Sequence, residues 1–309
     1  MLATGRVHHA LLRRAVLVLA LTCAPSVGPL RAQTGNEAAV PPASIGVIIV
    51  SHGGGPEWNA QVEQLAREVR LPGPVGISFL MGPGAATSRL QDVENELVRQ
   101  GARRIILVPL LVSSFSGHFE QIRYLAGETD TLDAEMLHHL EMSGITRGTS
   151  GVRVSVARAI DDATELAEVL TGRALAMATD PATEAVFIVG HGPSGSEEYA
   201  AWMGNLRRVA GSVRDVGGFR SVLVDLVRDD APDAVRAEAV LRIRELIELQ
   251  YAMTGHDVIV VPLLVASGAI SREKVPADLA GLPIRYSGAA LLPHPSMARW
   301  VELRAQQAY

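Results

Sequence analysis

Two histidines follow apolar segments of this chain and could bind a metal ion. His52 comes directly after the apolar run Ile45–Val50 and opens the glycine-rich turn Gly53–Gly55. His118 lies a few residues beyond a second apolar run, Arg104–Val112. A single histidine after a strand is more often a hydrogen-bonded structural residue, but two of them can share one ligand. Imidazole suits zinc, copper, nickel and iron, so the pair is a candidate metal site.

The elements that must position these histidines follow an α/β pattern. Apolar runs of four to eight residues alternate with longer amphipathic stretches, which is typical of parallel strands joined by crossover helices. Ligands of such sheets bind beyond the carboxyl ends of the strands, so we expect both histidines at one sheet edge. The sequence predicts eight strands: Ile45–Val50, Val75–Leu80, Arg104–Val112, Val152–Ala157, Ala185–Val189, Phe219–Leu226, Asp257–Val265 and Ile284–Ser287.

The eight strands form two sets of four that are related by an internal repeat. The segment Gly46–Gly53, which contains His52, returns as Ala185–Gly192, which contains His191. Val108–Val112 likewise returns as Val261–Val265, with the same five residue types. The offset between matching segments shifts along the chain, which indicates insertions between the repeated parts.

The repeat predicts two lobes of similar fold. We expect a linker over residues 33–44, a first lobe over 45–180 and a second lobe over 181–309, with insertions at 129–151 and 231–254. This length is sufficient for two hydrophobic cores of ordinary size. Because a covalent repeat already supplies two lobes, a homodimer is unnecessary and we expect a monomer.

The first 32 residues have the order of an export signal. Arg13 and Arg14 precede the apolar run Ala15–Leu21, and small residues lead to a cleavage point after Ala32. The run is well below the ~20 residues that span a bilayer, so we expect no permanent membrane span and a periplasmic location. The only cysteine, Cys23, lies in this leader within a poor lipidation box, so lipid anchoring is the less favoured alternative.

Short motifs around the two histidines resemble the class II chelatases, the sirohydrochlorin cobalt- and ferrochelatases of the CbiX type. The motifs are the strand–His52–glycine start, the lead Gln100–Arg104 into a Val-Pro-Leu strand, and Ser116–His118. The resemblance covers the chain after the leader twice over. It implies two similar α/β lobes facing a cleft, with metal binding and catalysis at His52 and His118.

The resemblance also implies a reaction, the insertion of a divalent metal into a tetrapyrrole such as sirohydrochlorin, as in cobalamin biosynthesis. Cobalt is the expected metal substrate, with iron(II) and nickel(II) as alternatives, because imidazole suits all three. The second lobe keeps His191 but has Ser271 at the position of His118. We therefore interpret that lobe as a degenerate repeat that forms a non-catalytic wall of the cleft.

One departure from the family pattern favours a different function. The family usually has a glutamate after the second strand, where this chain has Met81. Glu120 and Asp225 are candidate substitutes, although each is more simply a solvated helix-start or loop charge. Together with the export signal, this departure favours an exported protein that binds a metal or tetrapyrrole without inserting one into the other.

Other functions are disfavoured because the chain lacks a sequence feature that each of them requires. A net charge of −5 without a basic stripe argues against nucleic acid, and phosphate-binding glycine loops for nucleotides are absent. The turn at His52–Gly55 resembles an esterase motif, but a Gly-x-Ser-x-Gly elbow is missing. His118–Glu120 matches the His-x-Glu of zinc deaminases without their paired cysteines. Adjacent His138 and His139 are predicted to lie on a solvated helix.

Overall fold

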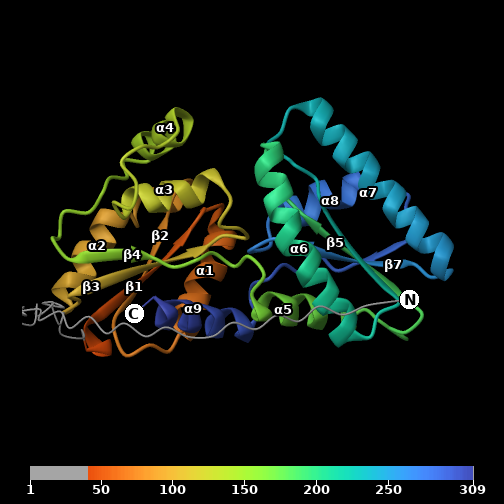
Figure 1. Cartoon of the computed structure of the whole chain (residues 1–309), viewed down its shortest axis with the longest axis horizontal. Coiled ribbons are helices and arrows are strands. Elements are labelled where there is room, and N and C mark those ends of the chain that lie inside the picture. Colours follow the sequence, from red (N-terminus) through yellow and green to blue (C-terminus); the bar gives the residue numbers. More distant parts are fainter. Residues whose placement is uncertain (1–40, 309) are drawn as a thin grey trace, which may run out of the picture. The chain divides into compact units, whose positions relative to one another are not determined.

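The computed structural model describes residues 41–308 (Figure 1). The predicted export signal, Cys23 and most of the predicted linker lie outside the described residues. Within the described part, no helix is both long and apolar enough to cross a membrane.

The first lobe is built on a four-stranded parallel sheet with the order β2-β1-β3-β4. Buried aliphatic side chains fill β1 and β3 on both faces, as expected for central strands covered by helices on each side. The strands are β1 (Ile45–Ser51), β2 (Val75–Phe79), β3 (Arg104–Leu110) and β4 (Arg153–Val156). The first-lobe helices are η1 (Pro42–Ser44), α1 (Pro56–Glu68), η2 (Pro83–Ala86), α2 (Leu90–Arg99), α3 (Gly117–Leu125), α4 (Ala134–Met142) and α5 (Thr164–Leu175).

The second lobe repeats this arrangement with a parallel sheet of order β6-β5-β7-β8. The strands are β5 (Ala185–Gly190), β6 (Ser221–Leu226), β7 (Val258–Leu263) and β8 (Ile284–Tyr286). The helices are α6 (Ser196–Gly217), α7 (Asp233–Thr254), η3 (Ile270–Lys274), α8 (Val275–Asp278) and α9 (Pro295–Gln307). The prediction of two four-stranded parallel sheets flanked by helices is therefore confirmed.

Strand ends differ from the predicted ends where the chain leaves the sheet. The run Arg104–Val112 forms a strand only to Leu110, because the amide of Leu111 donates a hydrogen bond of 2.8 Å to the carbonyl of Pro109 and turns the chain. The segment after this turn leads to α3 and His118. Hydrophobicity continues past the turn, so the apolar run alone could not locate it.

The last helix of each half packs on the sheet of the other half. Helix α5 contacts α6 and β7 of the second lobe, whereas α9 contacts α1 and β3 of the first. Figure 1 shows α9, in dark blue, below the first sheet and α5, in green, below the second. A single hydrophobic cluster, which includes Ile49, Leu170, Ile188 and Trp300, runs through both lobes.

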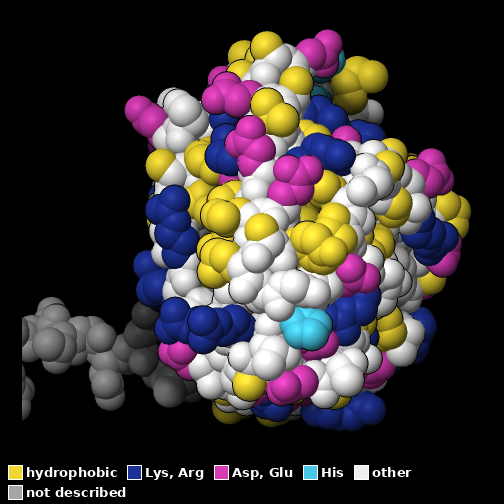
Figure 2. Space-filling view, turned by 90° about the vertical axis from the view of Figure 1, so that its right-hand side faces the viewer, with side chains coloured by type: hydrophobic (Ala, Val, Ile, Leu, Met, Phe, Trp, Pro, Cys, Tyr) yellow, Lys and Arg dark blue, Asp and Glu magenta, His cyan; other side chains and the backbone are white. Residues whose placement is uncertain are grey.

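The outer face of the second lobe mixes charged and apolar side chains (Figure 2). Basic and acidic groups alternate on this face, and separate apolar groups lie between them. Exposed apolar residues of α7 are Leu241, Leu249, Tyr251 and Met253.

Candidate metal centre

The carboxyl end of β1 presents His52. Its neighbour Gly53 has φ +94°, and a Cβ atom at this position would lie 2.2 Å from the carbonyl oxygen of Met81. Only glycine allows the β1 and β2 ends to approach this closely. The amide of Met81 in turn donates a hydrogen bond of 2.9 Å to the carbonyl of His52. The backbone around His52 is thus fixed by the neighbouring strand end.

The first turn of α3 presents His118. Ser116 caps this helix, since its side chain accepts a hydrogen bond of 3.2 Å from the amide of Phe119. The cap fixes where the helix begins, and with it the direction of the side chain two residues later. Short polar residues after β3 therefore determine the position of the second histidine.

The two histidine rings lie against each other at the edge of the first sheet. Their centroids are 4.7 Å apart and their planes meet at 82°. Nδ1 of His52 lies 2.7 Å from the carbonyl oxygen of Gly53, and this oxygen can only accept a hydrogen bond. Nδ1 of His52 therefore carries the proton, and Nε2 of the neutral ring keeps a free lone pair.

The same tautomer is imposed on His118 by Gln121. Nδ1 of His118 lies 2.8 Å from Oε1 of Gln121, whose Nε2 donates a hydrogen bond of 2.7 Å to the carbonyl of Met136. Because the carbonyl fixes the orientation of the Gln121 amide, Oε1 must be the atom that faces His118. Both imidazoles thus keep Nε2 as the free lone pair, which is the arrangement that a metal ligand needs.

Burial keeps both rings neutral. Desolvation is the main reason that the pKa of His118 falls to about 4, and the nearby His52 lowers it further. Desolvation also lowers the pKa of His52, in spite of its hydrogen bond to Gly53. Neutral rings at neutral pH have lone pairs available for a cation, whereas protonated rings would repel it.

Helix α4 lies in the inserted segment and supports the site. Met136 packs on Gly117, where a Cβ atom would lie 2.7 Å from the methionine sulfur. The two adjacent histidines of α4 differ, because His138 is exposed as expected whereas Nδ1 of His139 is buried without a hydrogen-bond partner. His139 also contributes to the lowered pKa values of His52 and His118. His139 is thus only partly solvated, whereas His138 faces solvent as predicted.

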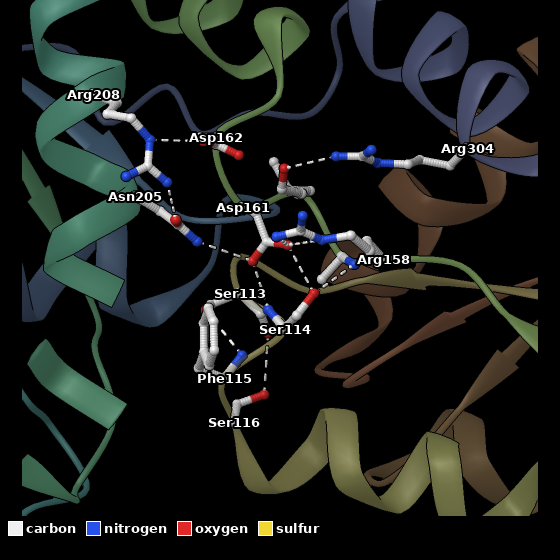
Figure 3. Close-up of polar contacts among 12 residues, drawn as sticks. Ser113, Ser114, Phe115, Ser116, Arg158, Asp161, Asp162, Asn205, Arg208 and Arg304 are labelled. Carbon is white, nitrogen blue, oxygen red and sulfur yellow. Dashed lines mark hydrogen bonds and ion pairs between the residues drawn. The ribbon is translucent and has the colours of Figure 1, made fainter. Parts of the chain in front are cut away.

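The loop between β3 and α3 is held by Asp161, whose side chain is fully buried (Figure 3). Its carboxylate accepts hydrogen bonds of 2.8 Å from both the amide and the hydroxyl of Ser114, and it pairs with Arg158. Asn205 of α6 adds a bond of 3.3 Å from the second lobe. Trp202 of α6 also donates a bond of 2.5 Å to the carbonyl of Phe115. The loop that leads to His118 is therefore fixed by both lobes.

The second lobe presents His191 at the end of β5, the position equivalent to His52. Nδ1 of His191 lies 2.9 Å from the carbonyl of Gly192, and the amide of Arg228 donates 2.7 Å to the carbonyl of His191. These contacts repeat those of the first lobe. Nε2 of His191 lies 3.5 Å from Oδ2 of Asp230, and both residues influence the pKa of His52. The carboxyl edge of the second sheet thus faces the histidine pair.

The two carboxylates that the sequence offered in place of the missing glutamate are engaged elsewhere. Glu120 is exposed and pairs with Arg123 at 3.1 Å, as expected for a solvated helix-start charge. Asp225 is a buried residue of β6, and its carboxylate binds the Tyr199 hydroxyl at 2.7 Å and Arg242 at 2.6 Å. The interpretation of Asp225 as a loop charge is therefore wrong.

The residues that match the histidine pair in the second lobe form no second site. Ser271 is fully buried, and its hydroxyl forms hydrogen bonds to the backbone of Gly268. A cavity of about 780 Å³ lies beside it, but the histidines do not line it. Over residues 41–308, no group of three or more histidine and acidic side chains is placed to hold one metal ion. The site thus offers two imidazoles and leaves other coordination positions open.

Sequence and structure comparisons show which proteins this chain is similar to. Residues 46–176 match the sequence model of the CbiX family. Among curated proteins, no sequence matches the chain. The fold is similar to SirB from Bacillus subtilis with Fe3+, at a TM-score of 0.58 and 17% identity, over 85% of this chain and 95% of that one.

Two further solved structures have the same fold. The sirohydrochlorin chelatase SirB from Bacillus subtilis subspecies spizizenii, in complex with cobalt, matches with a TM-score of 0.57 and 16% identity over 85% of this chain and 94% of that chain. A multi-domain protein from Deinococcus radiodurans with structural similarity to chelatases has a TM-score of 0.53 and 19% identity, over 85% of this chain and 54% of that chain. Residues 46–176 are therefore similar to the CbiX family, and the two lobes together have the fold of these solved structures.

Proposed function

We propose that this protein inserts a divalent metal ion into a tetrapyrrole such as sirohydrochlorin, with His52 and His118 presenting the metal. The observation that carries the proposal is the tautomer of the pair. Both Nδ1 atoms are committed to acceptors, so both Nε2 atoms are free lone pairs on rings whose centroids are 4.7 Å apart. The CbiX match and the two SirB structures with bound metal support it.

Two imidazoles suit a metal that must leave again. A site closed by three or four protein ligands holds its ion as a structural centre, whereas an open site keeps positions for an incoming partner. As the pyrrole nitrogens bind the ion, they replace its other ligands and draw it away from the histidines. Cobalt is our choice of metal substrate, because a cobalt complex exists for a protein of this fold; iron(II) and nickel(II) are alternatives.

The test is cobalt(II) insertion into sirohydrochlorin by the purified protein, followed by the change in absorbance. The matched control is the His52→Ala/His118→Ala double variant, which should fall to the uncatalysed rate. Turnover in the parent protein alone would support the chelatase. If both proteins match the uncatalysed rate while the parent still binds cobalt or the macrocycle, the exported binding protein becomes the better description.

We also propose that the protein acts outside the cytoplasm, after removal of residues 1–32. The support is the order of basic, apolar and small residues in the leader. Mass spectrometry of the protein from cell fractions tests this proposal. A periplasmic species that begins at Gln33 is expected, and a cytoplasmic species that retains the leader would contradict it.

A further inference from the structure

Metal insertion requires a proton acceptor in addition to the metal ligands. Two N–H protons leave the macrocycle when the ion binds to its four nitrogens. In the arrangement found here, His52 and His118 cannot accept them while they hold the metal. Each Nδ1 already carries a proton, and each Nε2 lone pair is the one that binds the ion. The acceptor must therefore be a group other than these two histidines.

We propose that His191 and Asp230 of the second lobe form this acceptor, so that the degenerate repeat supplies the base and the first lobe supplies the metal. This inference rests on the proposed function. His191 occupies the position in its sheet that His52 occupies in the first, immediately after the central strand. With no histidine at Ser271, His191 is not half of a second metal pair.

The geometry of the pair suits proton uptake at one defined atom. Nδ1 of His191 donates to the carbonyl of Gly192 at 2.9 Å, so the lone pair of the neutral ring is on Nε2. This Nε2 atom lies 3.5 Å from Oδ2 of Asp230, which would stabilise the imidazolium that forms. The side chain of Asp230 is 75% exposed, so water reaches the pair and can take the proton from the imidazolium.

The position of the pair relative to the metal histidines is fixed by contacts between the lobes. Trp202, on the helix that follows the His191 turn, donates to the carbonyl of Phe115 in the loop that leads to His118. Asp230 influences the pKa values of both His52 and His118, so its charge acts at the site.

The proton step balances without any other reactant. The N–H bond of one pyrrole breaks, the proton passes to Nε2 of His191, and the electron pair stays on the nitrogen and binds the metal. The imidazolium is stabilised by the carboxylate of Asp230 until it releases the proton to water. The pair is restored and takes the second proton in the same way.

The test compares single-turnover cobalt(II) insertion into sirohydrochlorin by the parent protein and by Asp230→Asn and His191→Gln. General bases typically contribute about 100-fold or more, so we expect each variant to be slower by at least 10- to 100-fold. Cobalt affinity, measured separately by titration, should stay within about two-fold because neither residue holds the metal. Glu248→Gln on α7 is the matched control, because it removes an exposed carboxylate from the same lobe.

Chemical rescue separates a base from a structural residue. Added acetate or imidazole should restore part of the rate of Asp230→Asn and leave the parent unchanged. Insertion by Asp230→Asn at the parental rate would overturn the inference. A parallel loss of cobalt binding in Asp230→Asn would also overturn it, because Asp230 would then be a ligand. The same holds if His139→Gln inserts cobalt slowly while Asp230→Asn inserts it at the parental rate. No turnover in the parent would instead refute the proposed function, and this inference with it.

Discussion

Gln121 joins His118 to the inserted helix through one side chain. It accepts the hydrogen bond of 2.8 Å from Nδ1 of the histidine and donates one of 2.7 Å to the carbonyl of Met136 in α4. The side chain is only 1% exposed, so water cannot replace either partner. The insertion thus has a direct effect on the orientation of the His118 ring.

Replacing Gln121 with leucine should weaken cobalt binding by roughly 10- to 100-fold, because partners that orient a metal-binding histidine typically contribute that much. Titration of the purified variant measures this loss. Gln121→Glu is the comparison variant, since it keeps an acceptor for His118 while it loses the donor to Met136 and adds a negative charge. Equal losses in both variants would show that the contact to α4, and not the one to His118, is what matters.

His118→Ala should abolish metal insertion and weaken metal binding while leaving the fold intact. The ring makes one side-chain hydrogen bond, so its removal costs about 1 kcal/mol and shifts the melting temperature by roughly 2–4 °C. Absorbance measures metal insertion, and calorimetry on the same sample measures the melting temperature. A large loss of stability would show that His118 is a structural residue.

Met81→Glu should raise the insertion rate. The amide of Met81 donates a hydrogen bond to the carbonyl of His52, so the two residues are neighbours. A carboxylate at position 81 would therefore lie close to His52 and add a ligand or a proton acceptor. Met81→Gln has the same length without the charge and serves as the control. An unchanged or lower rate in the glutamate variant would contradict the idea that a missing carboxylate limits the reaction.

The metal-free protein should lose stability as the pH falls below the pKa of free histidine. Burial lowers the pKa of His118 to about 4 in the folded chain, against about 6.5 when unfolded. Between these values the unfolded chain binds the extra proton, so the free energy of unfolding decreases as the pH falls from 6.5 to 4. The contribution is on the order of 2–3 kcal/mol.

Urea unfolding at pH 7 and pH 4.5 measures this dependence. His118→Ala lacks the titrating group, so its stability should change less over the same interval than that of the parent protein. Because all other titratable groups are common to both proteins, the difference isolates His118. Identical pH dependence would mean that the ring takes up its proton normally in the folded state.

Asp161→Ala should destabilise the protein by about 2–4 kcal/mol, since it leaves the partners of a buried carboxylate unpaired. Asp161 has φ +51°, a conformation that asparagine tolerates better than alanine. Asp161→Asn should therefore cost less. Denaturant unfolding ranks the variants, and cobalt titration of Asp161→Asn shows whether the loop it holds also sets metal affinity. An Asp161→Ala variant as stable as the parent protein would contradict the role assigned to this network.

The sequence was sufficient for the strands and for the close approach of His52 and His118. Apolar runs mark buried parallel strands, and a histidine directly after such a run must lie at the carboxyl edge. Asp225 shows what was overlooked, because a single aspartate inside the run Val224–Leu226 signals a buried, partnered carboxylate. That signal was present in the sequence.

Other parts of the site had no local signal. Gln121 acts through a helix that an insertion brings to it, and Asp161 depends on a positive φ value that aspartate adopts only in some contexts. Asp230 stands in an ordinary turn after β6, and its relation to His52 arises only when two sheets face each other. The positions of Gln121, Asp161 and Asp230 in the site all depend on contacts between segments that are distant in sequence.

The exchange of α5 and α9 between the lobes has a consequence for motion. Opening the lobes as rigid bodies would pull one helix from each sheet and expose apolar surface on both. Under the proposed function, a macrocycle should therefore reach His52 and His118 through local shifts of loops and of α4, with the two sheets nearly stationary. For the same reason the chain should unfold in one cooperative step, because neither half retains its own cover once the other is lost.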